Sequence, residues 1–250
     1  MTRTVPKTAL VTGAARRIGR AIALDLASHG WAVGVHYHAR DDDAAAVVAE
    51  ITAAGGRAVS LAADLRRESE VESLVARATE ALGSVGCLIN NAAVFDPDRL
   101  GDATRESWDA HLEVNLRAPF VLIQAMAAAL PEDAAGCIIN MLDQRVWNLT
   151  PNFVSYTLSK SALWALTRSA ALALAPRIRV NAIGPGPTLP SARQSRAQFQ
   201  RQCASLPLGR GTTPEEICDA VRFILGSPAM TGQMIALDGG QHLGWAQPGT

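Results

Sequence analysis

Short, continuously apolar runs alternate with helical patterns along almost the whole chain, and this alternation restricts the possible fold more than any other feature. The apolar runs predict strands at residues 7–12, 32–37, 57–62, 87–90, 137–141, 179–182 and 234–237. Helical spacing predicts helices at residues 18–29, 41–54, 68–82, 106–130, 152–174 and 214–225. Strands that are apolar on both faces are typical of a parallel sheet covered by helices. We therefore expect an α/β fold with a doubly wound parallel sheet, whose ligands lie at the carboxyl ends of the strands.

The turn after the first predicted strand, T-G-A-A-R-R-I-G at residues 12–19, lies where a phosphate-binding turn is expected. Gly13 and Gly19 flank it, and it opens the first predicted helix. Backbone N–H groups and a helix N-terminus at such a turn can bind a pyrophosphate. A glycine pair alone also fits an ordinary tight connection. The position between strand and helix favours a dinucleotide site.

The second predicted strand ends in H-Y-H-A-R, where a dinucleotide-binding fold contacts the adenosine ribose. The sequence places His36, His38 and Arg40 there, and Arg16 and Arg17 lie in the first turn. A site that prefers NAD offers a carboxylate to the ribose hydroxyls, whereas guanidinium groups suit a 2′-phosphate. We therefore predict that the cofactor is NADP(H).

These charges allow a second interpretation. Arg16, Arg17 and Arg40 also fit solvated surface groups, because arginine is mostly exposed in proteins. The aspartates at 41–43 would repel a 2′-phosphate. We interpret them as an N-cap and first-turn charges of the next helix, pointing away from the cofactor.

Tyr156 and Lys160 lie four residues apart in S-Y-T-L-S-K, within a predicted helix. Residues at this spacing share a helix face, so the ammonium group can lie beside the phenol. A phenol has an ordinary pKa of about 10, and a neighbouring cation favours its anion. The pair therefore indicates acid–base chemistry.

Composition excludes several other functions. The formal net charge of the 250 residues is zero, which argues against nucleic acid or an anionic membrane as a partner. The four cysteines are widely separated, and no histidines lie at metal-ligand spacing, so we expect no metal site and a reducing, cytoplasmic location. The polar N-terminus has no secretory pattern, and no apolar stretch is long enough to span a membrane. We expect residues 1–250 to form a single domain.

Several motifs occur in the order found in the short-chain dehydrogenase/reductase family, which this chain resembles over nearly its whole length. They are the first turn, Asn90-Asn91-Ala92, Asn115, Tyr156 with Lys160, Pro185-Gly186, and Leu237-Asp238-Gly239-Gly240. The resemblance implies a Rossmann-type domain with strand order 3-2-1-4-5-6-7, forming a homo-tetramer or homo-dimer. It implies that Tyr156 exchanges the proton, that Lys160 lowers the pKa of Tyr156 and orients the nicotinamide ribose, and that Asn115 holds a relay water next to Lys160. The cofactor-binding residues it implies are Gly13, Arg16, Arg17, Ile18, Gly19, His38, Arg40, Asp64, Leu65, Asn91, Ala92, Lys160, Pro185, Gly186 and Thr188.

Three departures from the general family pattern are informative. Arg17 replaces the middle glycine of the first turn, Asp143 replaces the catalytic serine, and Ala93 replaces the glycine after N-N-A. All three resemble the pteridine reductase-like branch of the family, as do H-Y-H and I-I-N-M-x-D. By that resemblance, Arg17 and His38 bind NADPH, and Phe95 stacks on the pterin opposite the nicotinamide.

The chemistry of Asp143 supports this interpretation independently. A serine can stabilise the oxyanion that forms when a ketone is reduced, and an ionised aspartate does this poorly. Reduction of a C=N bond needs a proton at nitrogen, which a carboxyl group with a raised pKa can deliver together with Tyr156. A turn cap without a catalytic part, or a defunct site, is the alternative interpretation of Asp143.

We therefore predict an NADPH-dependent reductase that transfers hydride to a pterin-like substrate, with Phe95, Asp143 and Tyr156 in contact with that substrate. Trp147 and Leu189 are predicted pocket walls, although packing in the core is an equally good interpretation. Residues 184–213 hold four prolines and form a predicted substrate-covering loop. The alternatives are an NADP(H)-dependent carbonyl reductase or alcohol dehydrogenase, and a non-catalytic NADP(H)-binding regulator.

Overall fold

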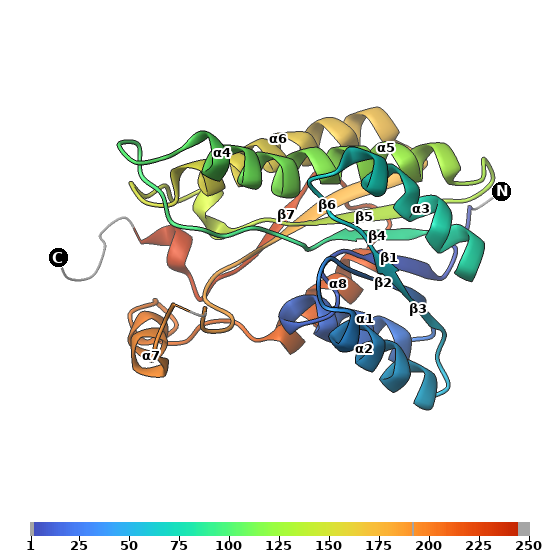
Figure 1. The fold of residues 1–250 in the computed structure, drawn as a ribbon, viewed down its shortest axis with the longest axis horizontal. Helices are drawn as coiled ribbons and strands as arrows, with labels where there is room; N and C mark the ends of the chain where they lie inside the picture. The colour runs from blue at the N-terminus through green and yellow to red at the C-terminus, as the bar shows by residue number, and fades with distance from the viewer. Residues whose placement is uncertain (1–2, 192, 245–250) are drawn as a thin grey trace.

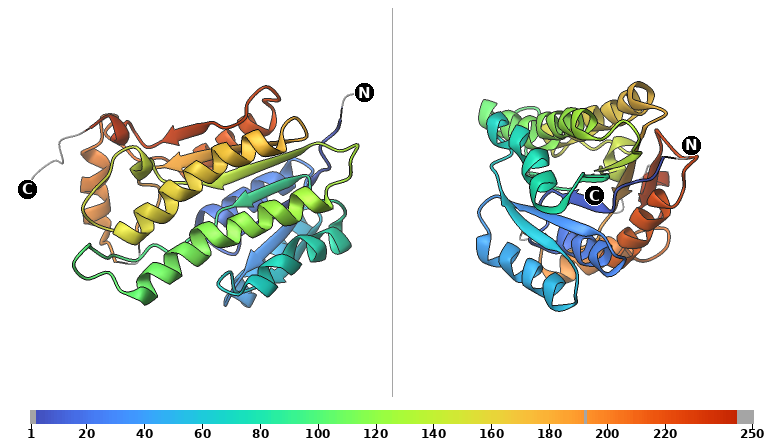
Figure 2. Two further views of the ribbon diagram at one scale, coloured as in Figure 1. Left: turned by 90° about the horizontal axis from the view of Figure 1, so that it is seen from above. Right: turned by 90° about the vertical axis from the view of Figure 1, so that its right-hand side faces the viewer.

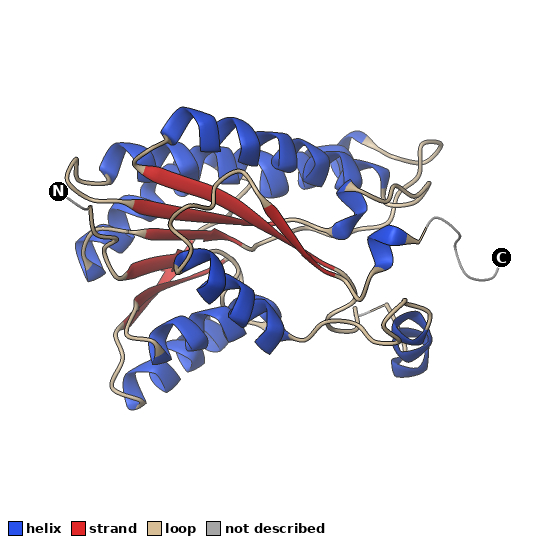
Figure 3. Ribbon diagram, turned by 180° about the vertical axis from the view of Figure 1, so that it is seen from behind, coloured by secondary structure: helices blue, strands red, loops and turns tan. Residues whose placement is uncertain are grey.

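A seven-stranded parallel sheet forms the centre of the molecule. The computed structural model describes residues 3–191 and 193–244. The strands are β1 (Thr8–Val11), β2 (Ala32–Tyr37), β3 (Ala58–Ala62), β4 (Cys87–Asn90), β5 (Gly136–Met141), β6 (Ile178–Pro185) and β7 (Met234–Leu237). They are arranged in the order β3-β2-β1-β4-β5-β6-β7 (Figure 1), and Figure 3 shows the sheet from behind. The predicted doubly wound topology and strand order are therefore confirmed.

Helices cover both faces of the sheet (Figures 1 and 2). One layer consists of α1 (Arg17–Ser28), α2 (Asp41–Ala53) and α8 (Pro214–Leu225). The other consists of α3 (Glu68–Leu82), α4 (Arg105–Leu112), α5 (Ala118–Ala129) and α6 (Val154–Leu174). A separate apolar cluster fills the space between the sheet and each layer. Because both faces are buried, most strands carry apolar side chains at successive positions.

The helix predicted at residues 106–130 is interrupted in the structure. A π-helical segment, η1 (Glu113–Arg117), separates α4 from α5. Pro119 has no N–H group to donate to the carbonyl of Asn115 four residues earlier, so regular α-helical pairing is broken there. Such π-helical bulges often occur at functional sites, and this one contains the predicted site residue Asn115.

Residues 184–213 are not a continuous loop, because they contain α7 (Arg196–Ala204). The capping box of Ser195 and Gln198 was a readable start signal for this helix. No side chain of α7 is buried, so its sequence lacks the apolar stripe by which a helix is recognised. In Figure 1, α7 stands apart from both helix layers, at the end of the molecule opposite the N-terminus.

The carboxyl ends of the strands bring the predicted site residues to one edge of the sheet. Asn90 of β4 lies opposite Asn140 of β5, and the two amides are hydrogen-bonded at 2.8 Å. The chain just after these strands carries Asn91 and Asp143. Two short 3-10 turns, η2 (Gln144–Val146) and η3 (Gln241–Leu243), lie beyond the same edge. Within the described part of the chain, no helix combines the length and hydrophobicity that crossing a bilayer needs.

Candidate active site

The turn between β1 and α1 has the close backbone approach expected of a phosphate-binding turn. Gly13 adopts φ +63°, and a Cβ atom at Gly19 would lie 2.2 Å from the Gly13 carbonyl oxygen. The side-chain amide of Asn91 donates to the carbonyls of Thr12 (2.8 Å) and Gly13 (3.2 Å). Thr12 Oγ1 accepts from the N–H of Ala92 at 3.0 Å. The predicted residues Gly13, Gly19, Asn91 and Ala92 therefore meet in one compact unit.

The two arginines of this turn have different partners. Arg16, the N-cap of α1, donates from Nε to the carboxylate of Asp43 in α2. Arg17 has φ +54°, which is unusual for a residue other than glycine. Its guanidinium donates to the carbonyls of Leu189 (3.2 Å) and Pro190 (3.0 Å). Arg17 therefore links the nucleotide turn to segment 184–213.

The end of β2 differs in part from the prediction. His36 is buried instead of facing a ribose; its Nδ1 accepts from the N–H of Gly13 at 3.0 Å, and burial lowers its pKa to about 4. His38 is exposed, with its Nε2 3.6 Å from Asp64 Oδ2. Arg40, and not an aspartate, is the N-cap of α2. The aspartates at 41–43 lie in the first turn of that helix, where negative charge is favourable.

Asp64 follows β3 and is held as a carboxylate. Arg66 Nη2 donates to Asp64 Oδ2 at 2.7 Å, and this pairing lowers the pKa of Asp64 to about 2. The neighbouring Leu65 is 7% exposed and belongs to the apolar core beneath α3 and α5. The side chains of Asp64 and His38 therefore lie close together at the ends of β3 and β2, while Leu65 packs in the interior.

Asp143, Tyr156 and Lys160 meet at the carboxyl end of β5. The Tyr156 hydroxyl donates to Asp143 Oδ2 at 3.0 Å. Lys160 Nζ donates to the carbonyl of Met141 at 2.7 Å and lies 5.8 Å from the centroid of the Tyr156 ring. Asp143 Oδ1 accepts from the N–H of Arg145 at 2.9 Å. The predicted trio is thus assembled, with the carboxyl group closer to the phenol than the ammonium group is.

Burial sets the protonation of all three groups. It raises the pKa of Asp143 above its ordinary 3.8, and it lowers the pKa of Lys160 from 10.5 to about 8. The pKa of Tyr156 is raised well above 10, first by burial and then by the adjacent Asp143. In the chain by itself, burial and Asp143 therefore outweigh the lowering of the Tyr156 pKa that was expected from Lys160. The carboxyl group is the nearer charge, and it opposes formation of the phenolate.

Asn115 is fully buried, and its amide is hydrogen-bonded within the protein. Its Nδ2 donates to Ser159 Oγ and to the carbonyl of Val94, both at 3.0 Å, and its Oδ1 accepts from the N–H of Val94 at 2.8 Å. The predicted relay water next to Lys160 is not needed to satisfy this amide. The contacts instead join α6 to the chain after β4.

A cavity of about 410 Å³ joins the nucleotide turn to the trio. Arg17, Ile18 and Asn91 line one part of it, and Asp143, Tyr156 and Lys160 line another. The remaining predicted residues that line it are Phe95, Pro185, Gly186, Thr188 and Leu189. Trp147 is absent from the described lining, and its ring packs 5.2 Å from that of His242. Segment 184–213 also contributes Arg193, Gln194, Phe199 and Gln202 to the lining, so it borders this cavity.

Phe95 is half-exposed at the cavity, but one face of its ring is occupied. It stacks on Phe153 with centroids 4.4 Å apart and an interplanar angle of 4°. Phe95 also meets the edge of Tyr156 at 4.7 Å. Phe153 was not predicted to be a site residue, because nothing in the sequence around it indicates that it packs against Phe95.

Comparison with known proteins identifies the family. A family model described as Enoyl-(Acyl carrier protein) reductase matches residues 13–242. A structure of a Short chain dehydrogenase from Burkholderia cenocepacia in complex with NADP is 34% identical, with a TM-score of 0.87 and coverage of 96% of this chain and 99% of that one. The chain belongs to the short-chain dehydrogenase/reductase family. The predicted family is therefore confirmed.

Two further members of the short-chain dehydrogenase/reductase family are informative. The 3-oxoacyl-[acyl-carrier-protein] reductase FabG of Staphylococcus epidermidis is 33% identical over 242 residues, which cover 95% of this chain and 99% of the relative. The structure of FolM Alternative dihydrofolate reductase 1 from Brucella suis in complex with NADP is 50% identical, with a TM-score of 0.94 and 98% coverage of both chains. The latter agrees with the resemblance to the pteridine reductase-like branch.

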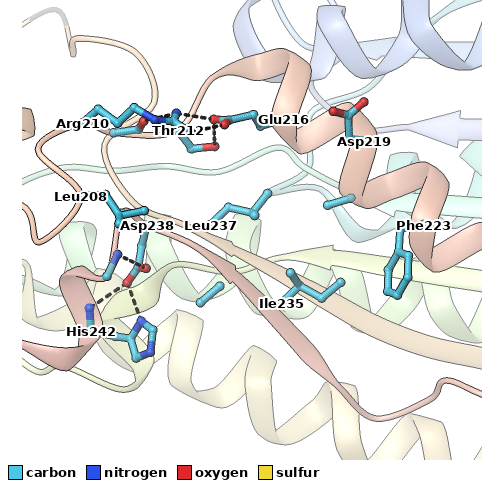
Figure 4. Close-up of a pocket in the computed structure, with 15 residues that line it drawn as sticks. Leu208, Arg210, Thr212, Glu216, Asp219, Phe223, Ile235, Leu237, Asp238 and His242 are labelled. Atoms are coloured by element: carbon cyan, nitrogen blue, oxygen red, sulfur yellow. Dashed lines mark hydrogen bonds and ion pairs between the residues drawn. The ribbon is translucent and has the colours of Figure 1, made fainter.

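Another cavity of this short-chain dehydrogenase/reductase, about 620 Å³, lies between α8, β7 and the chain around Leu208 (Figure 4). Four of its polar side chains form two pairs. Arg210 Nη2 contacts Glu216 at 2.6 Å, and His242 Nδ1 lies 2.8 Å from Asp238 Oδ2. The catalytic trio is absent from its described lining. The cavity of about 410 Å³ is therefore the candidate active site. Across the described residues, no group of three or more His, Cys, Asp or Glu side chains is placed to hold a metal ion.

Proposed function

We propose that this protein is an NADPH-dependent reductase that transfers hydride to a pterin-like ring, such as a dihydropteridine or dihydropterin. The observation that carries the proposal is the hydrogen bond between Tyr156 and the partly buried carboxyl group of Asp143. A carboxyl group of raised pKa can deliver a proton to a ring nitrogen, whereas its ionised form stabilises an oxyanion poorly.

The nucleotide end of the cavity fits NADP(H). A side chain at Gly13 or Gly19 would fill the turn, and the side chain of the α1 N-cap residue, Arg16, makes no capping hydrogen bond there. The N-terminus of α1 and the Arg17 guanidinium would receive the pyrophosphate. His38, exposed at the end of β2, would meet the 2′-phosphate. The Burkholderia cenocepacia and Brucella suis structures, both in complex with NADP, support this assignment.

The side chains around the trio supply the proton while the bound nicotinamide supplies the hydride. Tyr156 keeps its hydroxyl proton at neutral pH, because burial and Asp143 raise its pKa. Asp143, whose own pKa is raised, can pass a proton through the Tyr156 hydroxyl or directly to a nitrogen of the substrate. Lys160 is fixed to Met141 by its ammonium group, so it can orient the nicotinamide ribose. These roles are proposals from the geometry.

The substrate class is supported by a named relative. The Brucella suis protein, 50% identical to this chain, is named an alternative dihydrofolate reductase, and dihydrofolate contains a pterin ring. In this chain, Phe95 offers the cavity an aromatic ring for a flat heterocycle, and Leu189 offers an apolar wall. Homo-oligomeric assembly and a cytoplasmic location stay predictions.

A second candidate is a carbonyl reductase acting on 3-oxoacyl thioesters or other ketones. The similarity to the Staphylococcus epidermidis FabG protein favours it. The carboxyl group of Asp143 disfavours it when ionised, because a carboxylate beside a forming oxyanion is repulsive.

Turnover assays separate the two functions. NADPH consumption is followed with dihydrobiopterin, dihydromonapterin and dihydrofolate, and in parallel with simple ketones and a 3-oxoacyl thioester. We expect turnover with at least one pterin and little with the carbonyl compounds. Turnover of the thioester alone would replace the proposal by the second candidate. A fluorescence titration with NADPH and NADH tests the cofactor, with tighter binding of NADPH expected.

A further inference from the structure

The helix that carries Tyr156 begins without a capping side chain of its own. Phe153 precedes α6 in the left-handed region, with φ +58°, and no side-chain cap is formed by it. The first N–H groups of a helix have no partner within the helix, so buried ones need acceptors from elsewhere. Here the acceptors come from Asp98, which is 57 residues from Ser155 in the sequence.

Asp98 accepts hydrogen bonds from three successive N–H groups at the start of α6. Its backbone carbonyl accepts from the N–H groups of Phe153 at 2.7 Å and Val154 at 3.4 Å. Its carboxylate accepts from the N–H of Ser155 at 3.1 Å, and from the Ser155 hydroxyl. A carboxylate at a helix N-terminus is also favoured by the helix dipole. The next residue along α6 is Tyr156.

A second set of contacts fixes Asp98 itself. Asp98 is 6% exposed, and Ser107 of α4 donates to its carboxylate at 3.1 Å. His111, also of α4, is fully buried; its Nε2 accepts from the N–H of Asp96 at 3.1 Å, which leaves the proton on Nδ1. That Nδ1 lies 2.7 Å from Ser155 Oγ and 2.8 Å from the Ser107 carbonyl. The polar groups of this network are mutually satisfied.

The loop of residues 95–98, which carries Asp98, also has groups that face the cavity. Phe95 stacks on Phe153 and touches the edge of Tyr156. Asp96 pairs with Arg193 of the covering segment, and Arg193 Nη1 donates to the Phe95 carbonyl at 3.0 Å. The loop therefore contacts the catalytic tyrosine, the covering segment and the start of α6 within four residues.

We propose that Asp98 is a positioning residue, which holds the first turn of α6 so that the Tyr156 hydroxyl stays in contact with Asp143. The proposal depends on the catalytic role given to Tyr156 above. Asp98 itself does not line the described cavity, so it acts through the helix and not on the substrate. A small displacement of a catalytic group can reduce a rate by about a hundredfold.

The main test compares Asp98→Ala and Asp98→Asn with wild type. The asparagine keeps one oxygen acceptor for the Ser155 N–H but loses the charge and the second acceptor. Its effect on kcat should therefore lie between wild type and the alanine variant. We expect kcat to fall about a hundredfold in the alanine variant and about tenfold in the asparagine variant. KM for the pterin and the dissociation constant for NADPH should change less than about threefold, because neither ligand touches Asp98.

Thr167→Val is the matched control. Thr167 is a buried residue of the same helix, and its Oγ1 accepts from the Asn140 amide at 2.9 Å, three turns away from Tyr156. Its loss should lower Tm by an amount similar to that of Asp98→Asn and leave kcat near the wild-type value. If kcat falls in all three variants in proportion to Tm, Asp98 is merely structural and the proposal is wrong.

Two further measurements keep the proposal testable. Ser155→Ala removes only the hydroxyl that bridges Asp98 and His111, so it should fold even if Asp98→Ala does not, and kcat should fall severalfold.

The chain has two tyrosines, so in a Tyr37→Phe background the absorbance of tyrosinate reports Tyr156 alone. Asp98→Asn should lower the pKa of Tyr156 by loosening its contact with Asp143. If both kcat and the pKa of Tyr156 are unchanged in Asp98→Asn, the proposal is wrong. If wild-type enzyme is inactive on pterins, only the proposed function is wrong.

Discussion

Asp64 and Asp143 each follow a strand of the same sheet, yet their environments are opposite. Asp64, after β3, is paired with Arg66, which lowers its pKa to about 2. Asp143, after β5, is partly buried beside a phenol, and this desolvation raises its pKa. The carboxyl group of Asp64 is therefore ionised at physiological pH. The carboxyl group of Asp143 is protonated more readily than an ordinary carboxyl group. The two ends of the cavity are therefore built for different tasks, binding at the nucleotide end and proton transfer at the catalytic end.

The comparison extends to the surrounding charges. At the nucleotide end, the arginines are partly exposed and contact carboxylates or carbonyl groups, so they stay charged. At the catalytic end, Lys160 is 2% exposed and its pKa falls to about 8. Permanently charged groups suit recognition of phosphates, whereas groups with shifted pKa values suit acid–base catalysis. Substitutions at the nucleotide end should therefore change the affinity for NADPH, and substitutions at the catalytic end should change kcat.

The largest effect is expected for Tyr156→Phe. Removal of the hydroxyl deletes the proposed proton donor, so kcat should fall by about 10²–10⁴. The NADPH dissociation constant should stay near the wild-type value, as measured by fluorescence titration. Tyr37→Phe, which removes the other tyrosine hydroxyl, is the control and should keep full activity. If the Tyr156→Phe enzyme is active, the catalytic end does not depend on this hydroxyl and the comparison between the two ends is wrong.

Asp143→Asn should reduce kcat about a hundredfold and at the same time stabilise the protein at neutral pH. The pKa of Asp143 is raised above 3.8 in the folded state, so the folded protein binds more protons than the unfolded chain just above that pH. The stability from this group is present at low pH and is lost as pH rises through the folded pKa.

Thermal unfolding at several pH values tests this sign. The Tm of Asp143→Asn minus that of wild type should increase between about pH 4 and pH 7. The corresponding variant at the nucleotide end, Asp64→Asn, should show the reverse trend, because the pKa of Asp64 is lowered. Wild type therefore gains stability from Asp64 as pH rises from about 2 toward 4, and the variant does not. The same pH trend in both variants would contradict the comparison.

Arg17→Gly should act on binding and not on chemistry. The glycine accepts φ +54° without strain but removes the guanidinium, so NADPH affinity should fall about tenfold while the free energy of unfolding changes by less than about 1 kcal/mol. Binding is measured by fluorescence titration, and kcat at saturating NADPH should be nearly unchanged. Arg20→Ala, an arginine of the same helix that pairs with Glu50, should leave affinity unchanged.

The smallest effect is expected for Arg193→Ala. This substitution removes the contacts of the covering segment with Asp96 and the Phe95 carbonyl. Exposed ion pairs contribute little, about 0–1 kcal/mol, so KM for the substrate should rise up to about fivefold, with kcat unchanged. Arg196→Ala, on the exposed helix α7, is the control. A large decrease in kcat for Arg193→Ala would mean that the covering segment acts on the chemistry.

The nucleotide end was predicted more completely than the substrate end, for a physical reason. The turn at Gly13 and Gly19 is specified by backbone conformation and close approach, which glycine positions reveal directly. The partner of Arg16 was missed, because Asp43 lies on a different helix. At the substrate end, Asn115 contacts Val94 and Ser159, and Phe95 contacts Phe153, so these details depend on how separate segments meet. Helix α7 was missed because it buries no side chain.

The sequence by itself predicted the doubly wound sheet and the pairing of Tyr156 with Lys160, and its resemblance to the family implied the strand order and the place of Asp143. Apolar periodicity specifies buried strands, and a spacing of four residues puts two side chains on one helix face. Only the tertiary structure decided which of these groups holds a proton. A pKa depends on burial and on the nearest charge, and both are set here by segments far apart in the chain. The same dependence brings Asp98 to the start of α6, where no local pattern in the sequence predicts it.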